Sequence, residues 1–171
     1  MARKRLEFIR LGLRTRKAST KLRLRWDRAP LTVAATVPLL PVESQVYHGK
    51  YACNEIYVLL PMVKRPPPLQ WNCLYPGPGD LVFAPLPPDH TAHIMANLRS
   101  GQVPKMDARR GLLDLAFFYE RGNSLIGPVG VDNCSIVATG TSFEELDAFA
   151  DACRDMWFSG AKGESMYIEP A

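Results

Sequence analysis

The stretch that decides the fold reads VESQVYHGKYACNEIYVLL and spans residues 42–60. Its two ends, residues 42–48 and 54–60, are rich in β-branched and aromatic side chains, which are typical of strands. Gly49 stands in the connection between them, where glycine supplies the backbone freedom that a turn needs. The pattern therefore predicts a β-hairpin.

Upstream, residues 5–11 and 20–26 predict two further strands. Apolar and charged residues alternate in Leu22, Arg23 and Leu24, and a period of two is typical of half-buried strands. The polar residues 15–19 suit a hairpin connection. We interpret the charges as the wet face of a ribbon at the sheet edge, where Lys and Arg discourage pairing between molecules.

A short helix is expected between this ribbon and the 42–60 hairpin. Asp27 can cap its N-terminus, and Pro30 suits its first turn because the proline ring fixes a helical φ. The helix should end near Pro41, since proline cannot continue the helical hydrogen bonds.

A longer helix is predicted from Ser142 to Gly160. Ser142 and Glu145 form a capping box, in which each side chain accepts a bond from an amide of the first turn. Apolar residues then recur at helical spacing, with Phe149 and Cys153 on one stripe. This helix is expected to pack on the sheet.

Residues 61–90 hold nine of the fifteen prolines. Proline cannot donate to a sheet ladder, so we expect a long ordered loop or lid here rather than a regular central strand. A short strand should lead out of this loop. The further strands are expected at residues 81–85, 93–98, 112–119, 134–138 and 165–168.

These elements predict a mainly β chain with some α-helix, folded as one domain over residues 1–171. Closure into an antiparallel β-barrel would remove exposed sheet edges, and two packed sheets are the alternative. The short helix in the N-terminal half and the long C-terminal helix would accompany the barrel. Residues 1–19 would supply a basic N-terminal strand and extension.

The charges are divided unevenly along the chain. Residues 1–28 hold eleven Lys or Arg and two acids, whereas residues 29–171 hold ten and fifteen. A basic arm can attract phosphates, but the alternation assigns these charges to a sheet face, so no nucleic-acid partner is expected. No apolar run approaches the ~20 residues that a membrane-spanning helix needs. We therefore expect a cytoplasmic protein with no membrane partner.

The sequence predicts neither a metal nor a cofactor. His90 and His93 have the spacing of a ligand pair, but Asp89 is their one candidate third partner. No Gly-rich phosphate loop follows a strand. The four cysteines form no C-x-x-C pair, and we expect reduced thiols. They are Cys53, Cys73, Cys134 and Cys153.

Four segments resemble the cyclophilin-like superfamily in their order and spacing. They are residues 29–34 (APLTVA), 46–58 (VYHGKYACNEIYV), 75–81 (YPGPGDL) and 115–123 (LAFFYERGN). The similarity is greatest to a bacterial and archaeal family of this kind that is catalogued as a domain of unknown function (3830), over roughly residues 20–170. The resemblance implies a small β-barrel with helices closing its ends, and it leaves the activity open.

Prolyl isomerases of this superfamily place an arginine after a Phe-His pair. The similar stretch here reads Tyr47-His48-Gly49, so glycine stands at the arginine position. Arg121 could substitute from another strand, but such rate effects depend on placement within ~1 Å. Prolyl isomerisation is therefore not the favoured activity.

His48, Glu55 and Tyr57 lie on neighbouring expected strands and could converge, because opposed residues approach within about 5 Å. A carboxylate beside an imidazole supports acid–base chemistry, so His48 and Glu55 are the candidate catalytic residues. The alternative is a structural pair at a barrel end. Arg121 could give bidentate contacts to a carboxylate. The candidate ligand-binding residues are Tyr57, Tyr75, Tyr119, Arg121 and Asn123.

The leading hypothesis is a small-molecule binding protein or enzyme with a polar site at one barrel end, covered by the Pro-rich loop. A carboxylate or amide metabolite would suit the site, and hydrolase- or lyase-type acid–base chemistry is favoured over isomerisation. The alternative is a noncatalytic oligomeric or interaction module that uses exposed strands or the basic ribbon. A homo-oligomer is compatible with both.

Overall fold

The computed structural model describes residues 5–97, 108–127, 130–131 and 133–171. Its strands are β1 (Phe8–Leu13), β2 (Ala18–Leu24), β3 (Val42–Gln45), β4 (Tyr47–His48), β5 (Glu55–Pro61), β6 (Leu81–Leu86), β7 (Leu112–Phe118), β8 (Ile126–Gly127), β9 (Gly130–Val131), β10 (Ser135–Gly140) and β11 (Ser165–Pro170). Its helices are α1 (Pro30–Thr36), α2 (Pro88–Asn97) and α3 (Phe143–Ser159), with 3₁₀ turns η1 (Val37–Leu39) and η2 (Ala108–Arg110).

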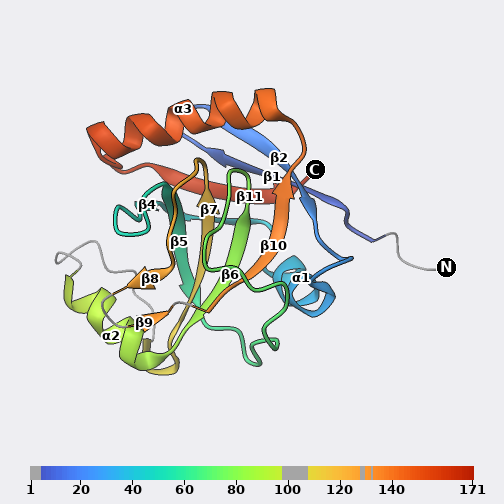
Figure 1. Cartoon of the computed structure of the whole chain (residues 1–171), viewed down its shortest axis with the longest axis vertical. Coiled ribbons are helices and arrows are strands. Elements are labelled where there is room, and N and C mark those ends of the chain that lie inside the picture. The colour runs from blue at the N-terminus through green and yellow to red at the C-terminus, as the bar shows by residue number, and fades with distance from the viewer. Residues whose placement is uncertain (1–4, 98–107, 128–129, 132) are drawn as a thin grey trace.

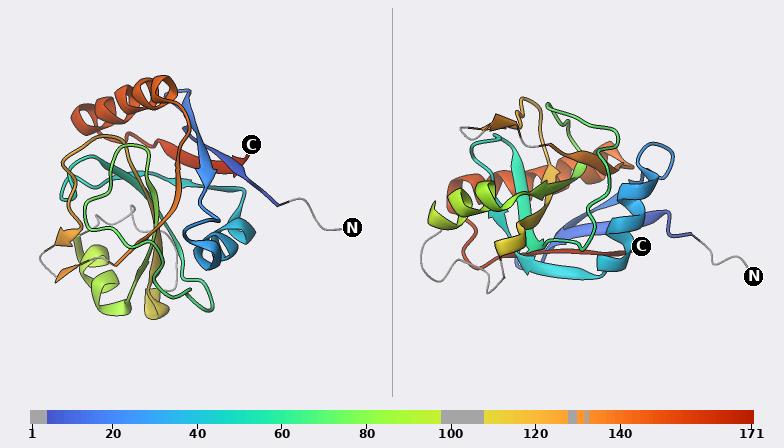
Figure 2. Two further views of the ribbon diagram at one scale, coloured as in Figure 1. Left: turned by 45° about the vertical axis from the view of Figure 1, so that its right-hand side comes forward. Right: turned by 90° about the horizontal axis from the view of Figure 1, so that it is seen from below.

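Within the described ranges, nine strands form one antiparallel sheet in the order β3-β11-β1-β2-β10-β6-β7-β5-β4. The two ends of this order, β3 and β4, are separated in the chain by Val46 alone, whose N–H donates to the Glu164 carbonyl at 3.2 Å. One bent strand therefore pairs first with β11 and then with β5, which makes a nearly closed barrel (Figures 1 and 2). The predicted barrel is confirmed, and two separate packed sheets are not formed.

The N-terminal hairpin lies inside the sheet rather than at its edge. β1 pairs with both β11 and β2, and β2 pairs with both β1 and β10. The hairpin itself is confirmed, with Leu13 opposite Ala18 at its turn. The predicted edge ribbon is wrong, because closure of the barrel gives each of these strands two neighbours.

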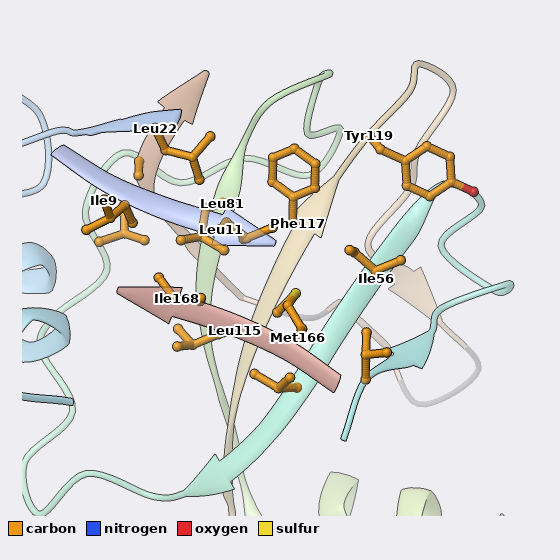
Figure 3. Close-up of a cluster of buried hydrophobic side chains, with 14 of the residues drawn as sticks. Ile9, Leu11, Leu22, Ile56, Leu81, Leu115, Phe117, Tyr119, Met166 and Ile168 are labelled. Carbon is orange, nitrogen blue, oxygen red and sulfur yellow. The ribbon is translucent and has the colours of Figure 1, made fainter. Parts of the chain in front are cut away.

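Apolar side chains fill the barrel interior. Alternate residues of the regular barrel strands point inward, as Ile56, Val58 and Leu60 do on β5. Figure 3 shows such side chains from separate strands meeting in one cluster. α3 lies across the top of the barrel in Figure 1 and adds Phe149, whose ring centroid is 5.4 Å from that of Phe117. The interior is thus a packed core.

The N-terminus of α3 carries half of the predicted capping box. The Ser142 hydroxyl accepts a hydrogen bond from the Glu145 N–H at 3.4 Å. The Glu145 carboxylate accepts instead from the backbone N–H of Lys21 on β2, at 2.9 Å. This carboxylate therefore ties the helix to the sheet rather than closing its own first turn.

The N-terminus of α1 is capped from a distant segment rather than by Asp27. Asp27 is bonded to the Arg25 guanidinium, at 2.8 and 2.9 Å. The side-chain oxygen of Gln70 accepts from the N–H groups of Leu31 and Thr32 at 2.8 and 3.0 Å. The predicted Asp27 cap is therefore wrong, and a residue of the Pro-rich loop satisfies these amides.

β6 is a central strand, although the proline content of residues 61–90 argues against one. It pairs with β10 on one side and with β7 on the other. Phe83 is its last residue paired with β10, so Pro85 lies where β6 has one neighbour and its missing N–H leaves no gap in the ladder to β10. The prediction that this stretch supplies no central strand is wrong.

The strand predicted at residues 93–98 is also wrong, as far as the described residues reach. α2 covers this stretch to Asn97, and Leu98 lies outside the described residues. Pro88 opens the helix and Asp89 stands in its first turn, where a carboxylate favours the positive end of the helix dipole. Of the helices in the described part of the chain, none combines the length and apolar character needed to cross a bilayer.

Candidate functional site

The strand register places His48 and Glu55 on opposite faces of the sheet. His48 lies opposite Ile56, an interior residue, so its ring points to the inner face. Tyr47 lies opposite Tyr57 on the outer face, and their rings stack with centroids 5.4 Å apart. Glu55 precedes Tyr57 by two residues and shares its face. The predicted convergence of His48 with Glu55 does not occur.

His48 is packed against the end of α3. Its Nε2 lies 2.8 Å from the Tyr119 hydroxyl, and its ring meets the Trp157 ring edge-on at 5.0 Å. Its Nδ1 is buried and makes no hydrogen bond with any described residue. Burial, helped by the nearby Lys50 ammonium, lowers the pKa of His48 to about 4. The imidazole is therefore neutral at pH 7 and joins β4 to the helix.

Two carboxylates and a phenol gather on the outer face of β5 and β7, and we call Glu55, Tyr57 and Asp114 the outer-face site. Tyr57 lies opposite Ala116, and Asp114 stands two residues from Ala116 on the same face. Burial raises the pKa of Tyr57, and the charges of Asp114 and Glu55 raise it further. Glu55 is 7% exposed, whereas Tyr57 and Asp114 are half-buried.

Small buried side chains lie beside these groups. Ala116 on β7 and Ala84 on β6 flank Asp114, since Ala84 is its direct partner across the strands. Apolar residues of the connecting segments, including Trp71 and Leu125, pack over the same face. The outer-face site is thus a cluster of three polar side chains within an otherwise apolar layer.

Gly49 makes room for the Glu55 carboxylate. Its N–H donates to the Glu55 carbonyl at 2.9 Å, and a Cβ at position 49 would overlap Glu55 Oε2. The glycine at this position, which the sequence comparison with prolyl isomerases singled out, therefore has a steric cause. It lets the β4–β5 hairpin bury a carboxylate.

The remaining predicted ligand-binding residues do not join the outer-face site. Tyr119 points inward to His48. Arg121 is exposed in the turn after β7, where its carbonyl accepts from the Asn54 side chain at 2.7 Å. Tyr75 is 66% exposed in the Pro-rich loop. The predicted anion-binding edge of Tyr119, Arg121 and Asn123 is therefore not assembled.

The buried side chain of Asn123 links three loop segments by hydrogen bonds. Its side-chain oxygen accepts from the Asn54 N–H at 3.0 Å, and its amide nitrogen donates to the carbonyls of Pro76 and Glu120 at 2.8 and 2.6 Å. It is 4% exposed. These contacts hold the turns around the outer face in place.

Asp114 is not among the candidate residues expected from the sequence. Its signal is visible in LLDLAFF, residues 112–118, where one carboxylate interrupts an apolar strand. The strand alternation puts Asp114 on the face opposite to Leu113 and Leu115.

Comparisons with known proteins place the chain in a family. Residues 11–168 match the model of the family described as "Protein of unknown function (DUF3830)". The chain belongs to this family. The membership predicted from the four sequence segments is confirmed, and the match extends further toward the N-terminus than the 20–170 expected.

Two solved structures are similar to this DUF3830 member at low sequence identity. McbB, solved in complex with tryptophan, has a TM-score of 0.57 and 17% identity, covering 95% of this chain. This chain spans 44% of the McbB chain. The hypothetical protein AF2241 from Archaeoglobus fulgidus has a TM-score of 0.48 and 15% identity, with both chains covered completely. The comparison with curated proteins finds no match.

A groove of about 310 Å³ lies at the other end of β5 of this DUF3830 member. The residues that line it come from the end of β5, the Pro-rich segment, β6 and η2. They are Met62, Val63, Lys64, Pro66, Pro85, Pro87, Pro88 and Arg110. None of Glu55, Tyr57 and Asp114 lines this groove.

Among the described residues, no group of three or more His, Cys, Asp or Glu side chains is placed to hold a metal ion. His90 and Asp89 both lie on α2. The side chain of His93 lies outside the described residues, so the weak His90 and His93 ligand pair stays a sequence observation.

Proposed function

We propose that the protein binds a small polar metabolite at the outer-face site and acts on it by acid–base chemistry. The observation that carries this proposal is the gathering of Glu55, Tyr57 and Asp114 in an otherwise apolar layer. Burial and the two nearby carboxylates raise the pKa of Tyr57, and a titratable group perturbed by burial and by specific charged neighbours is typical of functional sites. The site lies on the outside of the barrel wall, rather than at the barrel end that the sequence suggested.

The chemistry of the three groups defines the ligand class. Glu55 and Asp114 supply carboxylates, which accept hydrogen bonds and protons. Tyr57 has a raised pKa, with burial as the largest cause, so it stays protonated at neutral pH and can donate to a carbonyl oxygen. An amide- or amine-bearing metabolite fits this set better than a simple carboxylate. Glu55 or Asp114 would take the proton and Tyr57 would hold the substrate oxygen.

Binding of defined compounds tests this proposal. The panel contains primary amides, amines and amino acids, with tryptophan included because McbB was solved with it. A compound at 100 times its dissociation constant stabilises the fold by about 2.7 kcal/mol, which a thermal melt detects. We expect Glu55→Gln and Asp114→Asn each to weaken that binding about tenfold or more, equivalent to about 1.4 kcal/mol.

Asp147→Asn is the matched control, because Asp147 is exposed on α3 away from the outer face. It should bind as the natural protein does. If no compound of these classes raises the melting temperature, or if Glu55→Gln and Asp114→Asn bind unchanged, the proposal is rejected. Turnover of a bound compound, followed by mass spectrometry, then separates an enzyme from a binding protein.

The basic residues of the N-terminal segment give little support to the interaction-module alternative. Arg14 is bonded to Glu43, and Arg25 to Asp27. The Arg14 guanidinium also lies 3.9 Å from the centroid of the Tyr167 ring. Cations engaged in this way are less available to a phosphate backbone or an acidic partner.

A further inference from the structure

Cys73 and Cys134 lie directly opposite one another on two antiparallel segments. The pairing is fixed by the bridge between Asn72 and Ser135, because antiparallel partners shift in opposite directions along the chain. The Ile136 N–H donates to the Trp71 carbonyl at 3.3 Å, which keeps the same register on the other side of the bridge. The residue after Asn72 therefore faces the residue before Ser135.

The geometry suits a covalent link. Directly opposed residues of an antiparallel pair have Cα atoms about 4.5–5.5 Å apart, within the ~4.4–6.8 Å that disulfides span. The Cys134 thiol donates to the Cys73 carbonyl at 3.3 Å, so its sulfur already points toward the other cysteine. Both side chains belong to the apolar cluster on the outer face of the sheet.

We infer that Cys73 and Cys134 form a reversible disulfide when the protein meets a small-molecule disulfide such as oxidised glutathione. Cys73 is half-buried and Cys134 is fully buried, so the first attack falls to Cys73. Its thiolate attacks the oxidant, forms a mixed disulfide and releases one glutathione. The Cys134 sulfur then attacks the Cys73 sulfur and releases the second glutathione.

The reaction balances as an exchange. Two protein thiols are oxidised, one glutathione disulfide is reduced to two thiols, and the protons of the cysteines pass to the leaving thiolates. Burial raises the pKa of Cys134 to about 12, so the second step is the slow one. The bond would tie the segment around Trp71 to the start of β10.

This bond would lie beside the outer-face site. The Cys134 thiol is close enough to Asp114 and Glu55 for their charges to act on it. An effect of oxidation on ligand binding rests on the proposed function, whereas formation of the bond does not. Peptide mapping tests the bond alone, and binding to the oxidised protein tests its effect.

The experiment incubates the natural chain with oxidised glutathione, blocks free thiols with an alkylating agent, and maps peptides with and without reductant. Trypsin alone leaves Cys134 and Cys153 in one peptide, because no Lys or Arg lies between Arg121 and Arg154. A second protease that cuts after Glu144 or Glu145 separates them. We expect a linked pair of peptides carrying Cys73 and Cys134, lighter by two hydrogens than the sum of the free peptides and lost on reduction.

Cys53→Ser is the matched control, since Cys53 is the exposed cysteine. The link should persist in Cys53→Ser and vanish in Cys73→Ser, and the oxidised natural chain should have a higher urea midpoint than the reduced chain. The inference is overturned if Cys134 is fully alkylated after unfolding in denaturant, or if glutathione stays on Cys73 as a mixed disulfide. A link between Cys53 and Cys73 would overturn it equally.

Discussion

Gly49 and Glu55 face one another across the β4–β5 hairpin, and the Glu55 carboxylate occupies the space where a side chain at position 49 would begin. The glycine and the buried carboxylate therefore depend on one another. A side chain added at position 49 would have to displace the Glu55 carboxylate.

Gly49→Ala should destabilise the fold, because its new methyl group overlaps Glu55 Oε2. Overpacking of this kind costs roughly 1–3 kcal/mol. Urea denaturation of Gly49→Ala, Glu55→Ala and the double variant measures the coupling. We expect the double variant to be more stable than the sum of the single effects predicts, by about 0.5–3 kcal/mol. Additive effects would show that the two positions do not compete for space.

Stability should fall as the pH drops from about 6.5 to about 4, because His48 is held neutral in the fold. Its pKa is lowered to about 4 by burial and by Lys50, whereas the unfolded imidazole keeps a value near 6.5. The unfolded chain therefore binds the extra proton within this window, and unfolding becomes easier. The loss amounts to about 1–3 kcal/mol after allowance for partial exposure. Urea midpoints measured from pH 7.5 to 4 follow it.

His48→Phe isolates this contribution, since the phenyl ring can keep the contact with Trp157 but cannot titrate. Its stability should be lower at pH 7 through loss of the Tyr119 bond, and flatter between pH 6.5 and 4. An unchanged slope in His48→Phe would assign the effect to other groups.

The fold was largely readable from the sequence because strand alternation and helix signals are local. The run Leu22, Arg23, Leu24 defined β2, and Ser142 marked the start of α3. The errors came from long-range contacts. Gln70 caps α1 from a distant segment, 39 residues beyond Leu31. Pro85 is tolerated in β6 because the pairing of β6 with β10 ends at Phe83.

The candidate site was harder to predict because it depends on which face of the sheet each strand residue occupies. Residues one apart in register point to opposite faces, so pairing His48 with Ile56 separated His48 from Glu55. The sequence made Glu55 and Tyr57 candidates together with His48, and the strand alternation puts the first two on one face. It did not supply Asp114, because the register of β5 against β7 is fixed by contacts far apart in the chain.

Gln70→Ala should destabilise the protein by about 1 kcal/mol, the usual effect of removing a helix N-terminal cap. The amides of Leu31 and Thr32 would lose their acceptor. Gln70→Glu keeps an acceptor oxygen and adds a negative charge at the positive end of the helix dipole, so it should be tolerated. Thermal melts of the two variants compare them. Equal losses in both would mean that Gln70 acts by packing rather than by capping.

Glu164 should be the carboxylate on which the fold depends most in acid. Its side chain is fully buried, accepts from the N–H groups of Thr15, Arg16 and Ser165 at 2.7, 3.0 and 3.0 Å, and lies 3.3 Å from the Arg16 guanidinium. Burial acts to raise its pKa, but these bonds outweigh burial and lower it. The folded pKa thus lies below the unfolded value, so this stability is present above about pH 4.5 and is lost as the pH falls further.

Glu164→Gln removes the charge and turns an amide nitrogen toward groups that are themselves donors, so it should cost about 2–4 kcal/mol at pH 7. Glu43→Gln is the matched control, because Glu43 also pairs with an arginine, Arg14, but its side chain is 45% exposed. An exposed pair contributes little to stability, because solvent screens it. Urea midpoints at pH 7 and pH 3.5 separate the two, since the penalty of Glu164→Gln should shrink in acid while that of Glu43→Gln stays small. A penalty for Glu164→Gln that does not shrink would place the loss in packing instead of charge.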